Sequence, residues 1–254
     1  MKKMFLVVLI PALVVSAGFA QNKDWQNWSK SDADKILNNS GWSQVQSETD
    51  TSEMTYSPTS AGRSSVGTSS TNNVRRTSEQ QSINNNRADR GATNQPVSVN
   101  YHIRLLSAKP VRQAFMRSIT LEQKNADPEL LEGMKQFVAR DFKDFIVVAV
   151  TFDSTDSRFS GPALQAFATV RIGTLKNVTY LERKDGKRLS PIAYYPPIND
   201  GLGAKFVFPR GVDEQPFINL KTGNFRFYCE LTGQIKLNVT YKISDLMYDG
   251  SLEY

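Results

Sequence analysis

The chain has 254 residues, of which 39% are hydrophobic and 22% are charged, and its formal net charge is +6. Its mean hydropathy of −0.41 makes it poorer in apolar residues than most compact proteins of this length, so we expect part of it to stay unfolded. The sequence contains one Cys and one His. It therefore excludes an internal disulfide, a Cys-x-x-Cys site and any zinc site that needs two histidines from one chain.

The first twenty residues have the three-part pattern of a secretory signal peptide. Two lysines at positions 2 and 3 precede an apolar run from Phe5 to Val15, and small residues occupy positions 18 and 20. The run is too short for a stable membrane span. No cysteine follows it, so lipoprotein processing has no residue to acylate. We expect cleavage after Ala20 (1–20 signal peptide) and export of the mature chain to the periplasm or out of the cell.

Residues 21–45 form a short segment that contains all three tryptophans of the chain. Ser29 is a favourable N-cap with Asp32 three residues later, which predicts a helix over about residues 30–38. Such a short helix is marginal alone in water, so its apolar side needs a partner surface. That surface is either the chain's own domain or another protein, for which tryptophan is an enriched anchor. The candidate partner-binding residues are Trp25, Trp28, Ile36, Leu37 and Trp42.

Residues 46–97 form a polar tract in which 28 of 52 residues are Ser, Thr, Asn or Gln. This tract cannot bury enough apolar surface to offset the backbone ordering cost of about 1–2 kcal/mol per residue. The composition therefore predicts a disordered linker. Such a linker would tether the tryptophan segment to the folded domain.

Residues 98–254 carry most of the remaining periodic patterning. The alternation from Val97 to Leu105 predicts a strand, and it is followed by two helices. The first helix runs from about residue 111 to 122, and Asp127-Pro128 begins the second, whose apolar face we expect to be buried.

After the helical pair the pattern is that of strands. The run FIVVAVTF at 145–152 is typical of a fully buried strand, and Asp185-Gly186 predicts a hairpin turn. Further strands are predicted at 164–173, 178–184, 187–190, 204–209, 223–231 and 235–243, with a turn and a short strand at the end of the chain. The fold class is therefore mainly β (α+β): a β-sandwich-like C-terminal domain with an early helical pair, preceded by the linker and the short N-terminal helix.

The sequence contains few of the residue patterns that are typical of catalytic sites. There is no nucleophile elbow and no phosphate-binding glycine loop. His102 lies in a predicted strand and is expected to pack or face solvent, and Cys229 is expected to be a buried apolar residue. No catalytic residue, metal site or cofactor is predicted. A hydrolase that uses paired carboxylates stays open, because the separation of carboxylates is a three-dimensional quantity.

Two surface chemistries also stay open. Tyr194 and Tyr195 in a Pro-rich loop could form an aromatic platform for a carbohydrate. Basic pairs at 183–184 and 187–188 flank the predicted hairpin and are more typical of a solvated tip than of an anion site. No nucleic-acid recognition motif is present.

Three blocks of sequence together resemble a family of exported proteins from soil bacteria. They are WSKSDADKILNNSGW at 28–42, LLSAKPVRQAFMR at 105–117 and KISDLMYDGSLEY at 242–254. Members of that family usually have Ser-Pro-Trp where this chain has Ser40-Gly41-Trp42. The resemblance implies export and the segment order given above. It implies no activity, because none is assigned to the family.

These observations predict an exported interaction or binding module without catalytic activity, with a protein partner at the N-terminal tryptophan helix. The alternatives are a hydrolase that uses acidic residues and a carbohydrate-binding sandwich. After removal of the signal peptide, no integral membrane segment is expected.

Overall fold

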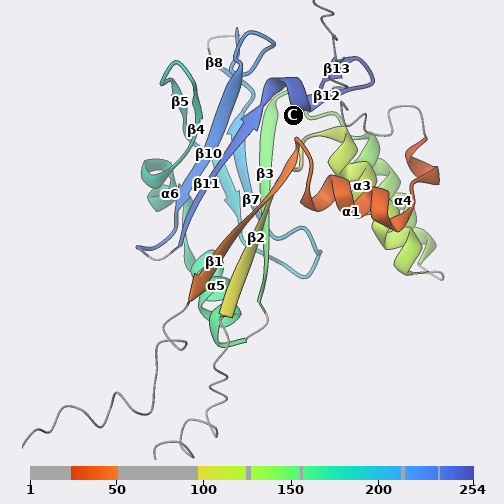
Figure 1. The fold of residues 1–254 in the computed structure, drawn as a ribbon, viewed down its shortest axis with the longest axis horizontal. Coiled ribbons are helices and arrows are strands. Elements are labelled where there is room, and N and C mark those ends of the chain that lie inside the picture. The colour runs from red at the N-terminus through yellow and green to blue at the C-terminus, as the bar shows by residue number, and fades with distance from the viewer. Residues whose placement is uncertain (1–23, 51–96, 124–126, 155–156, 213–214, 234) are drawn as a thin grey trace, which may run out of the picture.

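The computed structural model of the protein describes residues 24–50, 97–123, 127–154, 157–212, 215–233 and 235–254 (Figure 1). The predicted signal peptide and most of the polar tract lie outside these residues. The described chain is mainly β in an α+β arrangement, as the sequence predicts, with two large antiparallel sheets. No described helix has the length and apolar character needed to cross a membrane.

The first sheet has the strand order β1-β2-β3-β7-β6 and the second has the order β11-β10-β4-β5. The strands of the first are β1 (Ser43–Asp50), β2 (Val97–Leu105), β3 (Phe145–Ser154), β6 (Ala193–Tyr195) and β7 (Ala204–Pro209). Those of the second are β4 (Thr179–Arg183), β5 (Arg188–Leu189), β10 (Asn224–Glu230) and β11 (Lys236–Lys242). Two small hairpins are β8 (Gly211–Val212) with β9 (Gln215–Pro216), and β12 (Met247–Tyr248) with β13 (Ser251–Leu252).

The helices lie beside the sheets. They are α1 (Lys30–Asn38), α3 (Lys109–Glu122), α4 (Pro128–Ala139), α5 (Ser157–Thr169) and α6 (Ile172–Val178), with 3₁₀ turns η1 (Trp25–Asn27) and η2 (Ile243–Leu246). Helices α1, α3 and α4 gather on one side of the first sheet (Figure 1). The turn between β12 and β13 has two residues with positive φ, Asp249 and Gly250.

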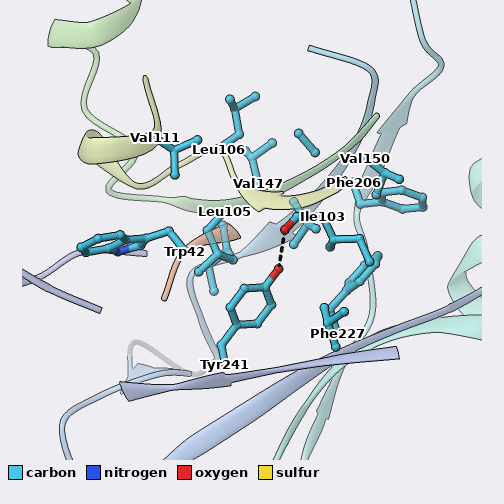
Figure 2. Close-up of a cluster of buried hydrophobic side chains, with 14 of the residues drawn as sticks. Trp42, Ile103, Leu105, Leu106, Val111, Val147, Val150, Phe206, Phe227 and Tyr241 are labelled. Carbon is cyan, nitrogen blue, oxygen red and sulfur yellow. Dashed lines mark hydrogen bonds between the residues drawn. The ribbon is translucent and has the colours of Figure 1, made fainter. Parts of the chain in front are cut away.

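The two sheets share one hydrophobic core. Phe206 and Phe208 on β7 meet Phe227 on β10, with ring centroids 5.5 and 6.3 Å apart. Tyr241 on β11 points across the core, and its hydroxyl donates a hydrogen bond of 3.3 Å to the carbonyl of Ile103 on β2 (Figure 2). Removing such side chains from water contributes about 1.5–3 kcal/mol each, so these contacts hold the sheets face to face.

The tryptophan segment is an integral part of this domain. Strand β1 pairs antiparallel with β2 along its whole length, from Ser43 opposite Arg104 to Asp50 opposite Val97. Residues 46–50, which the composition assigned to the linker, therefore lie in the sheet. Because Asp50 and Val97 are register partners, the rest of the polar tract joins two adjacent strands and is not a tether between separate bodies.

The polar side chains of β1 have a structural role that composition does not reveal. The amide of Gln44 donates to the carbonyl of Thr240 on β11 (2.5 Å), and that of Gln46 donates to the carbonyl of Lys236 (2.6 Å). The main-chain N–H of Asn238 in turn donates to the Gln46 side chain (2.8 Å). These glutamines satisfy backbone groups on the free edge of β11, so β1 links the edges of the two sheets through side chains.

Helix α1 begins and ends where the sequence predicts. Ser29 and Asp32 form a reciprocal capping box, which satisfies two of the N–H groups at the helix start. The side chains of its apolar face are all buried: Trp28, Ala33, Ile36 and Leu37.

Arg104 on β2 fixes the other end of α1. Its guanidinium donates to the carbonyl of Leu37 (2.6 Å), the side chain of Asn38 (3.0 Å) and the hydroxyl of Thr151 (2.6 Å). It also lies over the ring of Phe115, 5.5 Å from the centroid. Burial lowers the pKa of Arg104 to about 10, so it remains a cation at neutral pH and complements the carbonyl end of the helix.

The strand predicted at 164–173 is wrong, because this stretch forms α5 and the start of α6. Its alternating apolar residues imitate a strand, but Ala163 and Phe167 are four residues apart and both are buried on one helical face. Phe167 stacks on Phe152 of β3 at 5.4 Å. Helix α4 also differs from expectation, since Val138 is its one buried residue and Leu130 is 44% exposed.

Gly41, between α1 and β1, predicts a measurable stability effect. A Cβ atom at this position would lie 2.1 Å from the main-chain oxygen of Asp245. We expect Gly41→Ala to lower the free energy of unfolding by about 1–3 kcal/mol, because a backbone atom must move. Gly133, inside α4, has no atom within 4 Å of its Cβ position. Gly133→Ala should therefore raise stability by about 0.5–1 kcal/mol.

Urea unfolding of the two alanine variants, followed by circular dichroism, shows whether the free energy of unfolding falls for Gly41→Ala and rises for Gly133→Ala. If Gly41→Ala unfolds at the same urea concentration as the wild type, the close approach of Asp245 is not a constraint on this turn.

Candidate functional site

The structure places the five predicted partner-binding residues in the chain's own domain. Trp28, Ile36, Leu37 and Trp42 are buried in the hydrophobic core, with exposed fractions between 2% and 8%. The tryptophan helix therefore packs on its own domain, which is one of the two possibilities that the sequence leaves open. Trp25 is half-buried and lines a surface cleft.

The three sequence blocks on which the family resemblance rests meet beside this cleft. The indole N–H of Trp42 donates to the carbonyl of Glu253 (2.8 Å), and the N–H of Leu105 donates to the carbonyl of Trp42 (2.9 Å). The hydroxyl of Tyr248 donates to the side-chain oxygen of Gln113 (2.8 Å). Segments from the two ends of the described chain and from α3 thus form one corner of the molecule.

The cleft at this corner has a volume of about 1080 Å³. Its walls are the first turn of α3, the last turn of α4 with the loop at 140–143, the β12–β13 hairpin, and η1. A volume of this size is enough for a small organic ligand. The lining is mostly charged, so its electrostatics decide what it can hold.

Arg112 is the most deeply buried charge in the cleft lining, with 4% of its surface exposed. Its guanidinium donates to the carbonyls of Leu106, Ser107, Val138 and Arg140, and its Nε has no partner. Burial lowers its pKa to about 10, which still leaves it positively charged at pH 7. A full positive charge is therefore fixed in a region of low dielectric constant beside the cleft.

Arginine side chains gather around Phe142. The guanidinium carbons of Arg112 and Arg140 lie 4.7 and 5.4 Å from the centroid of the Phe142 ring, and Arg210 donates to the Phe142 carbonyl (3.1 Å). Lys143 follows in sequence and also lines the cleft. We call Arg112, Arg140, Lys143 and Arg210 the basic wall.

The basic wall has an excess of positive charge. In the described part of the chain, no Asp or Glu side-chain oxygen lies within 4.0 Å of its three guanidinium groups. Arg210 does donate to the main-chain oxygen of Tyr254 (2.9 Å), and the Lys143 ammonium pairs with Asp141 at 3.1 Å. Lys109 and Lys135 also line the cleft, and Lys135 pairs with Glu132 at 3.5 Å. The lining thus holds six cations and four carboxylates, and this excess of positive charge attracts an anion.

The cleft lining also holds acidic residues. Asp249, Asp24 and Glu253 all raise the pKa of the Tyr248 hydroxyl, which burial raises most, to about 12. The Tyr248 hydroxyl itself donates to the side-chain oxygen of Gln113. We call Asp24, Asp249 and Glu253 the acidic wall.

Two of these carboxylates already cap helices. An oxygen of Asp24 accepts the N–H of Gln26 at the start of η1 (3.2 Å), and an oxygen of Glu253 accepts the N–H of Lys109 at the start of α3 (3.1 Å). Both carboxylates therefore have a structural role at the start of a helical segment.

The histidine and the cysteine lie in different sheets. His102 on β2 contacts the carboxylate of Asp153 through Nε2 (2.9 Å), and Asn100 donates to the other oxygen of Asp153 (2.9 Å). Cys229 on β10 is fully buried, accepts a hydrogen bond from Thr179, and has its pKa raised by burial to about 12. The two side chains cannot act as a nucleophile and base pair.

Tyr194 and Tyr195 lie on strand β6 and not in the predicted loop, because they pair with Phe206 and Lys205 of β7, and they do not form a shared platform. Tyr194 is half-buried: its hydroxyl donates to the carbonyl of Phe167 (2.5 Å) and its ring lies 5.0 Å from that of Phe206. Tyr195 is 57% exposed. A sugar face would therefore meet one accessible ring here, which gives the carbohydrate alternative little support.

The basic residues of the β4–β5 hairpin are largely neutralised. Arg183 pairs with Asp185 (2.9 Å), and Arg188 pairs with Glu182 (2.7 Å). The exposed Lys184 lies at the tip between them. This hairpin has the charges of a solvated turn.

The sequence did not identify the cleft. Arg112 occupies a position of α3 where the helical spacing predicts an apolar residue, so the sequence alone marks it as unusual. Nothing in the sequence pattern indicates that Arg112 lies near residues 140–143, 210 or 248–253. No protein-family profile, curated protein or solved structure matches this chain. Among the residues that the structure describes, no group of three or more His, Cys, Asp or Glu side chains could hold a metal ion.

Proposed function

We propose that this chain is an exported binding protein and that the cleft beside α3 and α4 holds an anionic group of its ligand. The observation that supports this most directly is Arg112, a buried cation that is held by carbonyl groups, without a carboxylate within 4.0 Å in the described chain. Arg140, Lys143 and Arg210 extend the same positive region to the surface. Export rests on the signal-peptide pattern of residues 1–20.

The geometry favours binding over transformation. The polar groups of the basic wall are engaged in holding the fold: Arg112 with four carbonyls, and Arg210 with the main-chain oxygens of Phe142 and Tyr254. Groups fixed in this way are preorganised to attract an anion without rearrangement. The protein partner predicted at the tryptophan helix is not part of this proposal, since that helix is covered by the domain.

Titration with inorganic phosphate, followed by the amide NMR signals of the mature protein, tests the proposal. We expect saturable shifts at residues 107–113 and 139–143. Arg140→Gln combined with Lys143→Gln should weaken binding about tenfold or more, since a charged hydrogen bond is worth about 1.5–3 kcal/mol.

The matched control is Lys184→Gln with Lys187→Gln, which removes the same net charge from the β4–β5 hairpin. It should leave the phosphate affinity unchanged. Equal weakening by both double variants would show that phosphate senses only the overall charge, and shifts spread evenly over the molecule would exclude the cleft as the site.

A further inference from the structure

The start of α3 is capped by a carboxylate from the C-terminal segment. The N-cap residue of this helix is Ala108, whose side chain cannot accept a hydrogen bond, and Pro110 in the first turn has no N–H group. The first intrahelical bond runs from the N–H of Arg112 to the carbonyl of Ala108 (3.4 Å). The N–H of Lys109 instead donates to a side-chain oxygen of Glu253, 144 residues later (3.1 Å). The helix start therefore takes its negative partner from a distant part of the chain.

Main-chain contacts fix the position of Glu253. Its carbonyl accepts the indole N–H of Trp42 (2.8 Å), and its own N–H donates to the carbonyl of Leu246 (2.9 Å). Its side chain is half-buried and lines the cleft. The carboxylate is thus tethered beside the helix start by a short side chain on a fixed backbone, which gives it an effective concentration on the order of millimolar or more.

This carboxylate lies on the part of the cleft that best attracts an anion. A helix N-terminus presents N–H groups without intrahelical partners and about half a positive charge. Arg112, one turn into α3, is 4% exposed, and its Nε has no hydrogen-bond partner. Burial has the largest effect on the pKa of Arg112 and lowers it, and the charge of Glu253 opposes this lowering. Glu253 therefore already acts as the negative partner of both features.

We infer that Glu253 is a resident competitor: its carboxylate occupies the anion position at the start of α3 in the free protein, and the anionic group of the ligand displaces it. This inference rests on the proposed anion binding and adds where the anion binds and which residue opposes it. Displacement requires only a change of side-chain rotamer, because the main-chain bonds to Trp42 and Leu246 remain. The ligand then accepts the N–H of Lys109. Since the site is free only in the displaced state, the apparent affinity is lower than the intrinsic affinity.

Two substitutions at position 253 separate displacement from simple charge repulsion. Glu253→Asp keeps the charge but is one methylene shorter, so its carboxylate cannot reach the N–H of Lys109 from the same backbone. Titration with inorganic phosphate, followed by the amide NMR signals of the mature protein, measures the effect. We expect Glu253→Asp to tighten phosphate binding about tenfold, since no charged hydrogen bond has to be broken first. Charge repulsion alone predicts no change for this variant.

Glu253→Gln removes the charge but keeps an oxygen that can cap Lys109, so it keeps the start of α3 intact. It should also tighten phosphate binding, because a neutral cap is the weaker competitor. Asp249→Asn is its matched control: Asp249 is an exposed carboxylate of the acidic wall in the same cleft, and asparagine tolerates its positive φ of 49°. This control removes the same charge and should change the phosphate affinity by less than about threefold.

The outcomes distinguish the two proposals. If Glu253→Asp binds phosphate no more tightly than the wild type, and Glu253→Gln gains no more than Asp249→Asn, Glu253 is only a helix cap and the displacement inference fails, while the anion proposal stands. If phosphate binds none of the proteins at the cleft, the anion proposal fails as well.

Discussion

A Trp42→Ala variant will unfold with a free energy about 3–5 kcal/mol lower than that of the wild type, the cost typical of removing a buried tryptophan. Trp42 is 3% exposed, packs edge-on against Tyr248 at 6.1 Å, and donates its indole N–H to the carbonyl of Glu253. The alanine leaves a cavity and an unsatisfied carbonyl at the point where β1 meets the C-terminal segment. Urea unfolding, followed by circular dichroism because the variant removes a fluorophore, measures the loss.

Trp25→Ala is the control within the same segment. Trp25 is half-buried in η1, so its removal should cost less than about 1.5 kcal/mol, below the range for a fully buried side chain. Similar losses of unfolding free energy for the two variants would mean that Trp42 stabilises the N-terminal segment no more than Trp25 does. A small loss for Trp42→Ala would contradict the burial of this segment in the domain.

An Arg112→Met variant will lose about 2–6 kcal/mol of stability. Methionine replaces the stem of the side chain, but the carbonyls of Ser107 and Arg140 lose their donor, at about 1–3 kcal/mol for each buried group. These carbonyls belong to the start of α3 and the end of α4, so the connection between the two helices should loosen first. Hydrogen exchange of the α4 amides, measured together with urea unfolding, detects this local effect.

Arg140→Met tests whether removal of a positive charge alone explains the loss of stability expected for Arg112→Met. Arg140 lies over the same ring of Phe142 but is exposed, so we expect a stability change within about 1 kcal/mol. If the two methionine variants are equally stable, the carbonyl cage around Arg112 contributes nothing to the fold. Both should weaken phosphate binding, since both remove a cation of the basic wall.

Local chemistry was sufficient to predict the elements that depend on their own residues. The capping box of Ser29 and Asp32 located α1, the apolar run at 145–152 located β3, and Asp185-Gly186 located the β4–β5 hairpin. Each of these patterns satisfies its backbone groups within a few residues. They are therefore readable without knowing the tertiary structure.

Elements stabilised by distant partners were misread. The polar stretch 46–50 is a strand because β2 satisfies its backbone and β11 accepts its side chains, neither of which is visible in the composition. The region 164–173 is helical because Phe167 fits against Phe152 and Tyr101. The cleft was not predictable for the same reason, as its basic wall combines α3, the loop after α4 and the end of β7.

The link between β1 and β11 has a consequence for how the protein is made. Gln46 and Lys236 are 190 residues apart in the chain, and Trp42 and Glu253 are 211 apart. Contacts of such separation cannot form until the last residues have left the ribosome, which gives the fold a high contact order and slow assembly. The N-terminal segment therefore cannot complete its packing before residues 236–253 have been synthesised. Under the proposed export, the chain would still be unfolded when a secretion machinery received it.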